Sequence, residues 1–489
     1  MRKMSGKTPV TNKKNMIKHH PATMNSPGLL LIAALCLAAC ATAKAQPQTM
    51  TFEAAWERVK TSSDQLAAAQ AAVDSKALQF RGLKGLGGPV VSVSAAAYAY
   101  NANLNVNLDP INQHLAQISQ QLPIPLQNLP IPVTLPQFPA SYTFNRHNTG
   151  TTQSISALWP IYTGGASDAV RGFVGAQGSE ARADADKTGH ELATLLAQRY
   201  FGAQLADKAA ALRKAALSDI QQHDSAAAKM LAAGVISRIE RLQAQAAYED
   251  AKRQSLKAHD EAELAAIALA RTVRSDALIK PETPLFVITQ AIEPLPHFLN
   301  EALLRHPGLA KVSAKRAQAE QLHQGQEALR KPQVFAFGQR ELKTGSADWV
   351  GGVGVRWTLF DAVDRNALAA SSNKLVEQAE RTAAQARSDI SLAVEKNWRT
   401  LEQTRLQFLA SSTSVELSNE VLRLRTSALR EGTGTALELM DAEVNQAKVK
   451  TERAQIAYDY VMALARLLES CGLSEEFSRY IARADVKMN

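Results

Sequence analysis

Two carboxylates stand one helical turn apart, directly after a short break in a long helical pattern. The break lies in "LREGTGTALELMDAEV", residues 429–444, and the two carboxylates are Glu438 and Asp441. Residues three apart on a helix share a face, so this pair presents two negative charges side by side. Such a pair can attract cations where it lines a pore, or it can be an ordinary solvated face of a helix.

The rest of the sequence does not support an enzyme. It contains no His-Glu-x-x-His motif and no nucleophile elbow, and its histidines are scattered along the chain. The glycine-rich stretch "GLKGLGG", residues 82–88, lacks the Lys-Ser/Thr pair of a phosphate-binding loop. Apart from two cysteines in the first 40 residues there is only Cys471, which excludes a cysteine metal cluster. We expect no catalytic residue, no metal and no cofactor.

The positive charge of the chain is concentrated at its N-terminus. The formal charge is +9, but residues 1–45 hold seven Lys and Arg and no Asp or Glu, which leaves +2 for the remainder. Nucleic acid is therefore not expected as a partner. The basic start precedes the apolar run "GLLLIAALCLAAC", which is too short to span a membrane and predicts a secretory signal.

Two processing routes are open for this signal. "LAAC" has the form of a lipobox and would leave Cys40 lipidated, whereas "AKA" suits cleavage before Gln46. Met16 and Met24 are alternative start residues that would give a signal of more usual length. Either route predicts export from the cytoplasm.

The exported part of the chain consists of two related sequence repeats. Trp159 and Trp357 lie 198 residues apart, and the same offset relates Gly234 to Gly432 and Tyr200 to Trp398. A register held over so many residues indicates an internal duplication. The expected segments are a targeting segment 1–45, a first repeat 46–280, a Pro-rich linker 281–296, a second repeat 297–471 and a C-terminal tail 472–489.

Each repeat has the same order of predicted elements. An Ala-rich helical segment, 51–83 or 297–330, is followed by two short strands and then by a very long helical region. "SISALWPIY" and "WVGGVGVRWTLF" alternate apolar and small or polar residues, as a strand with one buried face does, and "NLNVNL" and "VFAFGQ" are the expected partner strands. The Pro-rich stretch 109–140 between the first two strands predicts a long surface loop. We favour a surface loop without a specific function for this stretch over a receptor site or a lid.

The long helical regions predict a coiled-coil architecture. No proline occurs between Pro160 and Pro281 or after Pro332, and a helix over 168–231 would be close to 100 Å long at about 1.5 Å per residue. "REGTGTA" interrupts the second region, where Gly432 and Gly434 permit backbone angles that let the helix reverse.

The four predicted strands cannot close a barrel alone. Strands in a bilayer must have every backbone group paired, and single-chain barrels begin at about eight strands. Three chains would supply twelve strands, with the helices continuing the same tube below the membrane. The predicted fold is thus an α+β membrane protein, a trimeric 12-stranded outer-membrane β-barrel extended by a periplasmic α-helical barrel.

These features resemble TolC-like outer-membrane efflux proteins over essentially the whole mature length. The resemblance rests on the strand exits "WPIYTGG" and "WTLFD" and on the two tips "AAGVISRIE" and "REGTGTALE", each about 75 residues after its exit. It implies a homotrimer in outer-membrane lipid that receives substrate from an inner-membrane pump or ABC transporter through a periplasmic adaptor (membrane fusion) protein.

The resemblance also implies roles for residues at the tips. Glu438 and Asp441 would line the pore entrance and select cations. Adaptor docking falls on four positions at the two turns: Gly234, Val235, Gly432 and Thr433. Some relatives close the entrance with an arginine after the second tip glycine, but Gly434 stands at that position here. Glu240 and Arg238 are the remaining candidates for a gate.

Two other functions remain as alternatives. The same duct could serve efflux of small molecules, which we favour, or type I protein secretion. A non-conducting periplasmic coiled-coil scaffold would explain the export and the helices, but it would leave amphipathic strands with exposed edges.

Overall fold

The computed structural model describes residues 48–100, 105–109, 112, 141–143, 148–343, 345, 348–360 and 362–488. The signal segment, Cys40 and nearly all of the Pro-rich stretch 109–140 lie outside the described residues. Residues 48–489 form one compact unit.

The first half of the chain contains two short helices, a pair of long strands and a helical hairpin. Its elements are β1 (Gln48–Met50), α2 (Phe52–Ser62), α3 (Asp64–Gly82), the 3-10 turn η1 (Leu83–Gly85), β2 (Val90–Tyr100), β3 (Asn105–Asn107), β4 (Ser141–Thr143), β5 (Asn148–Tyr162), α5 (Ala166–Ala232) and α6 (Arg238–Thr272).

The second half repeats this order after a connecting segment. Its elements are β6 (Ile279–Pro281), β7 (Leu285–Val287), α7 (Leu295–Arg305), α8 (Pro307–Ala328), β8 (Gln333–Glu341), β9 (Trp349–Arg356), α9 (Arg365–Arg430), α10 (Ala436–Cys471), η2 (Ser474–Glu476), α11 (Phe477–Ala482) and β10 (Val486–Met488). The long helices α5 and α9 have 67 and 66 residues, as the duplication predicts.

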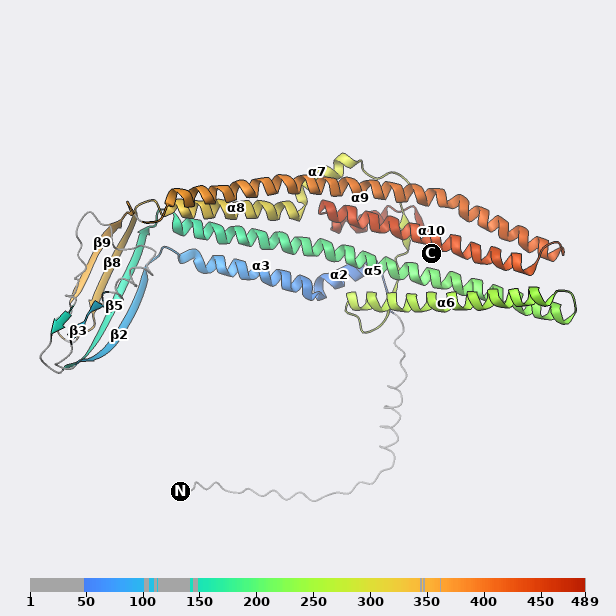
Figure 1. Cartoon of the computed structure of the whole chain (residues 1–489), viewed down its shortest axis with the longest axis horizontal. Coiled ribbons are helices and arrows are strands. Elements are labelled where there is room, and N and C mark those ends of the chain that lie inside the picture. The colour runs from blue at the N-terminus through green and yellow to red at the C-terminus, as the bar shows by residue number, and fades with distance from the viewer. Residues whose placement is uncertain are drawn as a thin grey trace, which may run out of the picture. The chain divides into compact units, whose positions relative to one another are not determined.

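Four strands form one antiparallel sheet in the order β2-β5-β8-β9 (Figure 1). The predicted strands "SISALWPIY", "VFAFGQ" and the first part of "WVGGVGVRWTLF" lie in this sheet, although β9 ends at Arg356. The prediction for "NLNVNL" was wrong in one respect, because the partner of β5 is β2 and β3 pairs with β4. Small residues such as Ala95 to Ala97 weaken the apolar alternation of β2, and this concealed the strand.

The two faces of the sheet differ in polarity. One face carries exposed apolar side chains that are neighbours across the strands: Val91, Val93, Ile155, Trp159, Trp349, Val353 and Val355. On the opposite face the Ser92 and Ser156 hydroxyls lie 2.8 Å apart, and those of Ser94 and Ser154 lie 2.9 Å apart. A sheet with one apolar exposed face and one hydroxyl-bearing face is the pattern of a membrane strand with a wet inner side.

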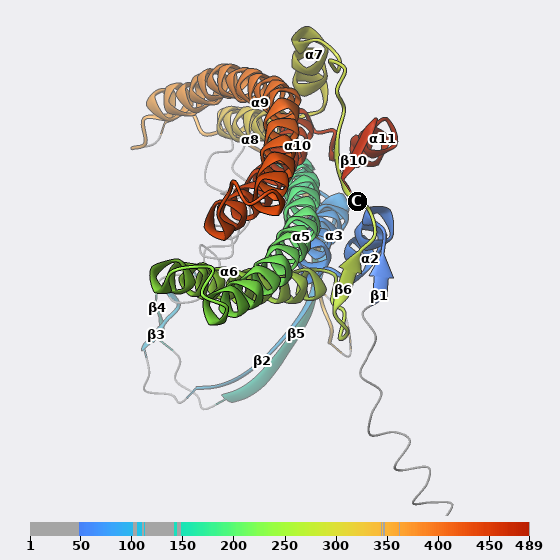
Figure 2. The ribbon, with the colours of Figure 1, turned by 90° about the vertical axis from the view of Figure 1, so that its right-hand side faces the viewer.

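The long helices run on from this sheet and lie side by side. In the view along them, α9, α10, α5 and α6 follow one another in a curved row (Figure 2). The short helices α3 and α8 pack against α5 near the sheet, and the α5–α6 and α9–α10 turns lie at the far end (Figure 1). No described helix combines the length and the apolar character needed to cross a membrane.

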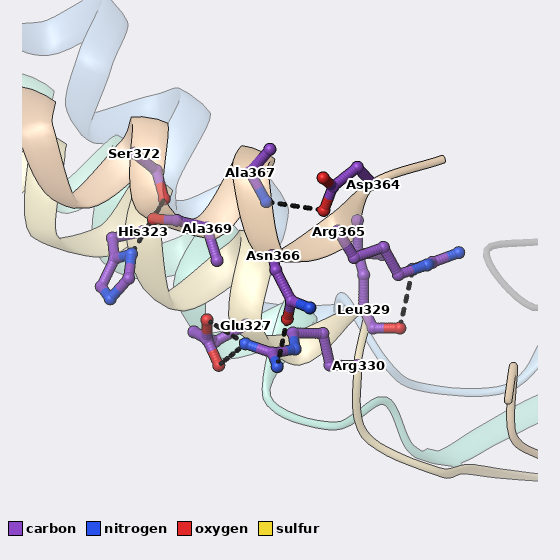
Figure 3. A network of polar contacts seen from close by, with 10 residues as sticks. All are labelled: His323, Glu327, Leu329, Arg330, Asp364, Arg365, Asn366, Ala367, Ala369 and Ser372. Atoms are coloured by element: carbon purple, nitrogen blue, oxygen red, sulfur yellow. Dashed lines mark hydrogen bonds and ion pairs between the residues drawn. The ribbon is translucent and has the colours of Figure 1, made fainter. Parts of the chain in front are cut away.

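A network of polar contacts fixes the passage from α8 through β8 and β9 into α9 (Figure 3). Arg330 donates to Glu327 and to the Asn366 side chain, and Arg365 donates to the carbonyl of Leu329 at 2.9 Å. Asp364 caps the start of α9 by accepting from the amide of Ala367. These bonds hold the end of α8 beside the start of α9 on the helical side of the sheet.

The connecting segment and the chain end form a buried belt around the middle of the helices. β7 pairs with β10, and β6 pairs with β1. Leu285, Phe286 and Val287 are buried in the same core as Phe201 and Phe477. The Pro-rich linker and the C-terminal tail expected from the sequence are therefore packed structure, because their apolar residues are buried against α5 and α10.

Aromatic residues at equivalent positions of the two repeats hold this belt. Tyr200 donates its hydroxyl to the carbonyl of Met50 at 2.6 Å and accepts from the amide of Thr283 at 2.8 Å. Its counterpart Trp398 donates its indole N–H to the carbonyl of Glu293 at 3.1 Å. The duplication thus places a belt-binding aromatic on each of the two longest helices.

The Tyr200 hydroxyl offers a test of the belt. Tyr200→Phe removes the partner of the half-buried Thr283 amide and one of the two donors to the Met50 carbonyl, so we expect the free energy of unfolding to fall by about 1–3 kcal/mol. Thermal unfolding followed by circular dichroism measures the change. Tyr458→Phe is the matched control, since the Tyr458 hydroxyl makes no hydrogen bond within the described residues; equal effects of the two changes would contradict the role of Tyr200.

Candidate channel entrance at the hairpin tips

Both hairpin turns end their first helix with the same glycine motif. Gly234 has φ +72°, and the next amide, that of Val235, donates to the carbonyl of Met230 at 2.9 Å. Gly432 has φ +74°, and the amide of Thr433 donates to the carbonyl of Ala428 at 2.9 Å. A left-handed glycine with this 6→1 bond is the Schellman ending of a helix, which satisfies its last carbonyls.

Gly434 serves a different purpose from the one predicted. Its φ is not positive, so the reversal at the second tip depends on Gly432. A Cβ atom at position 434 would lie 3.0 Å from the Cβ of Ala428, a distance shorter than normal packing permits. The residue is a glycine because the chain returns closely over the end of α9.

Both second helices begin with a capping box. The Ser237 hydroxyl accepts from the amide of Glu240, and the Glu240 carboxylate accepts from the amide of Ser237 at 2.7 Å. Thr435 and Glu438 make the equivalent pair of bonds at the start of α10. The spacing Ser/Thr-x-x-Glu is visible in both tips, and it is the sequence signal that predicts this role.

The structure gives the two predicted pore carboxylates different surroundings. Glu438 accepts from Thr435 and forms an ion pair of 3.0 Å with Arg425 of α9, its side chain remaining 44% exposed. Asp441 is exposed and makes no hydrogen bond or ion pair within the described part of the chain. Of these two carboxylates, Asp441 is the one whose charge has no partner among the described residues.

The candidate gate residues lie together but do not pair. Within the described residues no ion pair joins Arg238 to Glu240, whose carboxylate is turned onto Ser237. Hydrogen bonds from Ser237 lower the pKa of Glu240 below the ordinary value. The cap thus keeps this exposed carboxylate ionised, and its part in a gate stays a prediction.

Sequence analysis missed a pair that connects the two hairpins close to the tips. The Nε2 atom of His223 on α5 lies 2.9 Å from Oε1 of Glu443 on α10, and the two side chains are only 26% and 11% exposed. They lie beside a small apolar core that contains Ile220 and Met440. No spacing in the sequence relates residues 220 positions apart, so only the packing of α5 against α10 shows the contact.

Burial is the main influence on the pKa of Glu443. It raises the pKa of Glu443, while the nearby His223 lowers that pKa and Asp219 raises it. The second oxygen of Glu443 is buried without a hydrogen-bond partner in the described residues. No group of three or more metal-ligating side chains is arranged for an ion among the described residues, which leaves the pair as a polar contact between helices.

The family of the chain follows from comparison with known proteins. A family model described as outer membrane efflux protein matches residues 134–273 and 298–473. The chain belongs to the outer membrane efflux protein family. Comparison with curated proteins found no match.

Solved structures share the fold of this outer membrane efflux protein. A membrane protein from Pseudomonas aeruginosa has 13% identity and a TM-score of 0.70, covering 86% of this chain and 90% of that chain. The CmeC outer membrane channel of Campylobacter jejuni has 14% identity and a TM-score of 0.69, covering 88% of each chain. The open state of the MtrE outer membrane channel of Neisseria gonorrhoeae has 16% identity and a TM-score of 0.67, covering 86% and 88%.

Membership of this family establishes the location and the class of the protein. It is an outer-membrane efflux channel protein with a periplasmic helical extension, and it is not an enzyme. The two matched segments fall in the two halves of the duplicated chain. The hairpin tips are then the periplasmic end of the outer membrane efflux protein.

Replacement of Glu443 tests the charge of the buried pair. A carboxyl whose pKa is raised by folding contributes stability below its ordinary pKa of 4.5 and loses it as pH rises through the folded value. Glu443→Gln removes this titration. We therefore expect the unfolding midpoint of the variant, relative to that of the wild type, to rise as the pH is raised from 4.5 to 7.5. Thermal unfolding at three pH values measures it. Exposed Glu263→Gln is the control, and an identical pH profile for E443Q and wild type would refute the assignment.

Proposed function

We propose that three copies of this protein form the exit duct of a tripartite export system. The observation that carries the proposal is the four-stranded sheet, which has an apolar exposed face and ends in the edge strands β2 and β9. Unpaired strand edges are not tolerated in lipid, so the edges require strands from further copies. Three copies supply twelve strands, within the range of known outer-membrane barrels.

The helices support a continuous conduit in this assembly. In the curved row of α9, α10, α5 and α6 (Figure 2), α6 and α9 are the outermost helices. Both carry exposed apolar side chains, among them Leu256 and Leu264 on α6 and Leu406 and Leu417 on α9. Helices with unburied apolar stripes associate as coiled coils. We infer that α6 of one copy packs against α9 of the next, which closes the row into a tube.

The duct would work with an inner-membrane pump and a periplasmic adaptor. The tips Gly234, Val235, Gly432 and Thr433 are exposed, and Val235 is 68% exposed although it is apolar. We propose these turns as the adaptor contact, in line with the family resemblance. The cargo is proposed to be small molecules such as drugs. Type I protein secretion remains the alternative, because the cargo is selected by the pump, which is a different protein.

The segment boundaries are proposed as the sequence suggested. The targeting segment 1–45 would be removed, or the chain would be cleaved before Cys40 and lipidated there. The two repeats, 46–280 and 297–471, would each supply two strands and one helical hairpin to every copy. The buried belt formed by 281–296 and 472–489 would encircle the tube.

The unequal surroundings of the two pore carboxylates give a specific expectation for conduction. In planar bilayers, Asp441→Asn should reduce cation selectivity and block by multivalent cations more than Glu438→Gln, because Arg425 already neutralises Glu438. Asp260→Asn on α6 is the matched control. An ordered rod that never conducts ions would exclude the duct and favour a scaffold, while equal selectivity of D441N and wild type would remove Asp441 from the pore.

Adaptor docking can be tested at the first tip. Val235→Glu places a charge on an exposed apolar tip residue and should abolish crosslinking to the cognate adaptor, with trimer yield unchanged. Leu304→Glu on α7 makes the same kind of change at an exposed position away from the tips, and adaptor crosslinking should persist. Normal crosslinking of V235E would show that the adaptor binds elsewhere.

A further inference from the structure

The helices α3 and α5 lie side by side on the helical side of the sheet (Figure 1). A groove with cationic lining residues lies between them. Its volume is about 310 Å³. The lining residues are Val73, Lys76, Ala77, Phe80, Arg81, Lys84, Val174, Gly175, Gly178 and Arg182. Four of these side chains are cationic and none is acidic, so the groove is complementary to an anion.

The four cations of this groove form no ion pair with the described part of the chain. Lys76 donates to the amide oxygen of Gln177 at 3.0 Å, which leaves its charge in place. Arg81, Lys84 and Arg182 form no ion pair within the described residues. Most other cations on this part of α5 and α8 are paired, as Lys311 is with Asp184 at 2.8 Å. The groove is therefore a local excess of positive charge.

The groove also has apolar lining residues. Phe80 lies close to Gly175, where an added Cβ would meet the Phe80 ring at 3.4 Å. Val73, Ala77 and Val174 line the same groove, and Phe80 is 40% exposed. A lining that is both apolar and cationic suits a ligand that is both anionic and amphiphilic, since a free inorganic anion gains nothing from the apolar residues.

The position of the groove identifies the source of the ligand. α3 ends at Gly82 and β2 begins at Val90, whose neighbours Val91 and Val93 project exposed apolar side chains from the sheet. A groove that reaches from residue 73 to residue 84 lies within about 15 Å of the helix end. The groove thus borders the zone where the lipid headgroups meet the hydrocarbon layer.

We propose that the α3–α5 groove binds the headgroup of an anionic phospholipid from the periplasmic leaflet of the outer membrane. Lys84 and Arg81 contact the phosphate nearest the sheet, while Lys76 and Arg182 hold the negative headgroup deeper in the groove. The acyl chains extend along the exposed valines of β2. The proposal rests on the outer-membrane location of the protein and is independent of conduction.

Native mass spectrometry of the purified full-length trimer in neutral detergent tests the proposal. Phosphatidylglycerol and phosphatidylcholine with the same acyl chains are added in turn, and bound lipids are counted. We expect phosphatidylglycerol to bind about tenfold more tightly or better, because its negative headgroup is attracted to the four cationic side chains that line the groove. Arg81→Gln with Lys84→Gln should lower its affinity to that of phosphatidylcholine. Lys252→Gln with Arg271→Gln makes the same charge change on α6 and should have no effect.

A second variant blocks the groove without changing charge. A Cβ at Gly178 would have no atom within 4 Å, so Gly178→Leu fills the groove from α5. The change replaces a glycine inside a helix and should not weaken that helix. Loss of phosphatidylglycerol binding in G178L, with the trimer intact, would support the groove as the site.

Three outcomes would overturn the proposal. The first is equal lipid binding by wild type, the double variant and G178L. The second is displacement of phosphatidylglycerol by inorganic phosphate at equal concentration, which identifies a free anion as the ligand. The third is loss of the trimer in R81Q/K84Q or G178L, which identifies the groove as a contact between copies. Conductance of the same samples separates this test from the duct, since a non-conducting trimer that binds phosphatidylglycerol refutes only the duct.

Discussion

The pairing of backbone groups at the edges of a short sheet is the constraint on which this structure depends. Among the described residues, β2 and β9 each have one edge whose amides and carbonyls are not paired with another strand, and both strands carry exposed apolar side chains on one face of the sheet. Water cannot satisfy such groups inside a bilayer, and each unpaired group costs several kcal/mol there. In the proposed trimer, strands of neighbouring copies would pair with these edges, so assembly and membrane insertion would be coupled.

The buried belt in the middle of the helices stabilises them by packing. Helices as long as α5 and α9 have low intrinsic stability over most of their length, since most of the stabilisation of a helix comes from packing. Here the linker, the first strand and the chain end are buried together against these helices, with Phe52, Tyr200, Phe201, Phe286 and Phe477 in ring contact. The belt is the part of the chain with a globular core, and it joins the two repeats.

The first role of the glutamates at the tips is structural, because they cap the helices that follow the turns. Glu240 and Glu438 occupy equivalent positions of the duplication and both complete capping boxes, so a carboxylate would be favoured at these sites in any helical hairpin. Asp441, one turn further on, has no such structural use in the described chain. The distinction matters because the loss of a cap weakens the helix start, whereas the loss of a free charge alters only the electric field. The buried pair of His223 and Glu443 adds a polar contact between hairpins at the same level.

The sequence by itself determined the duplication, the long helices, the turns at Gly234 and Gly432 and three of the four long strands, because each depends on local periodicity or on the conformational freedom of glycine. It also determined the family, through motifs in fixed register. The tertiary structure alone decided that β2 pairs with β5, that Gly434 avoids a clash instead of making the turn, and that Arg425 neutralises Glu438. It also decided the burial of the linker, the His223–Glu443 contact and the basic groove beside α3. Each of these joins residues that are distant in sequence or depends on a side chain's surroundings, and neither spacing nor composition carries that information.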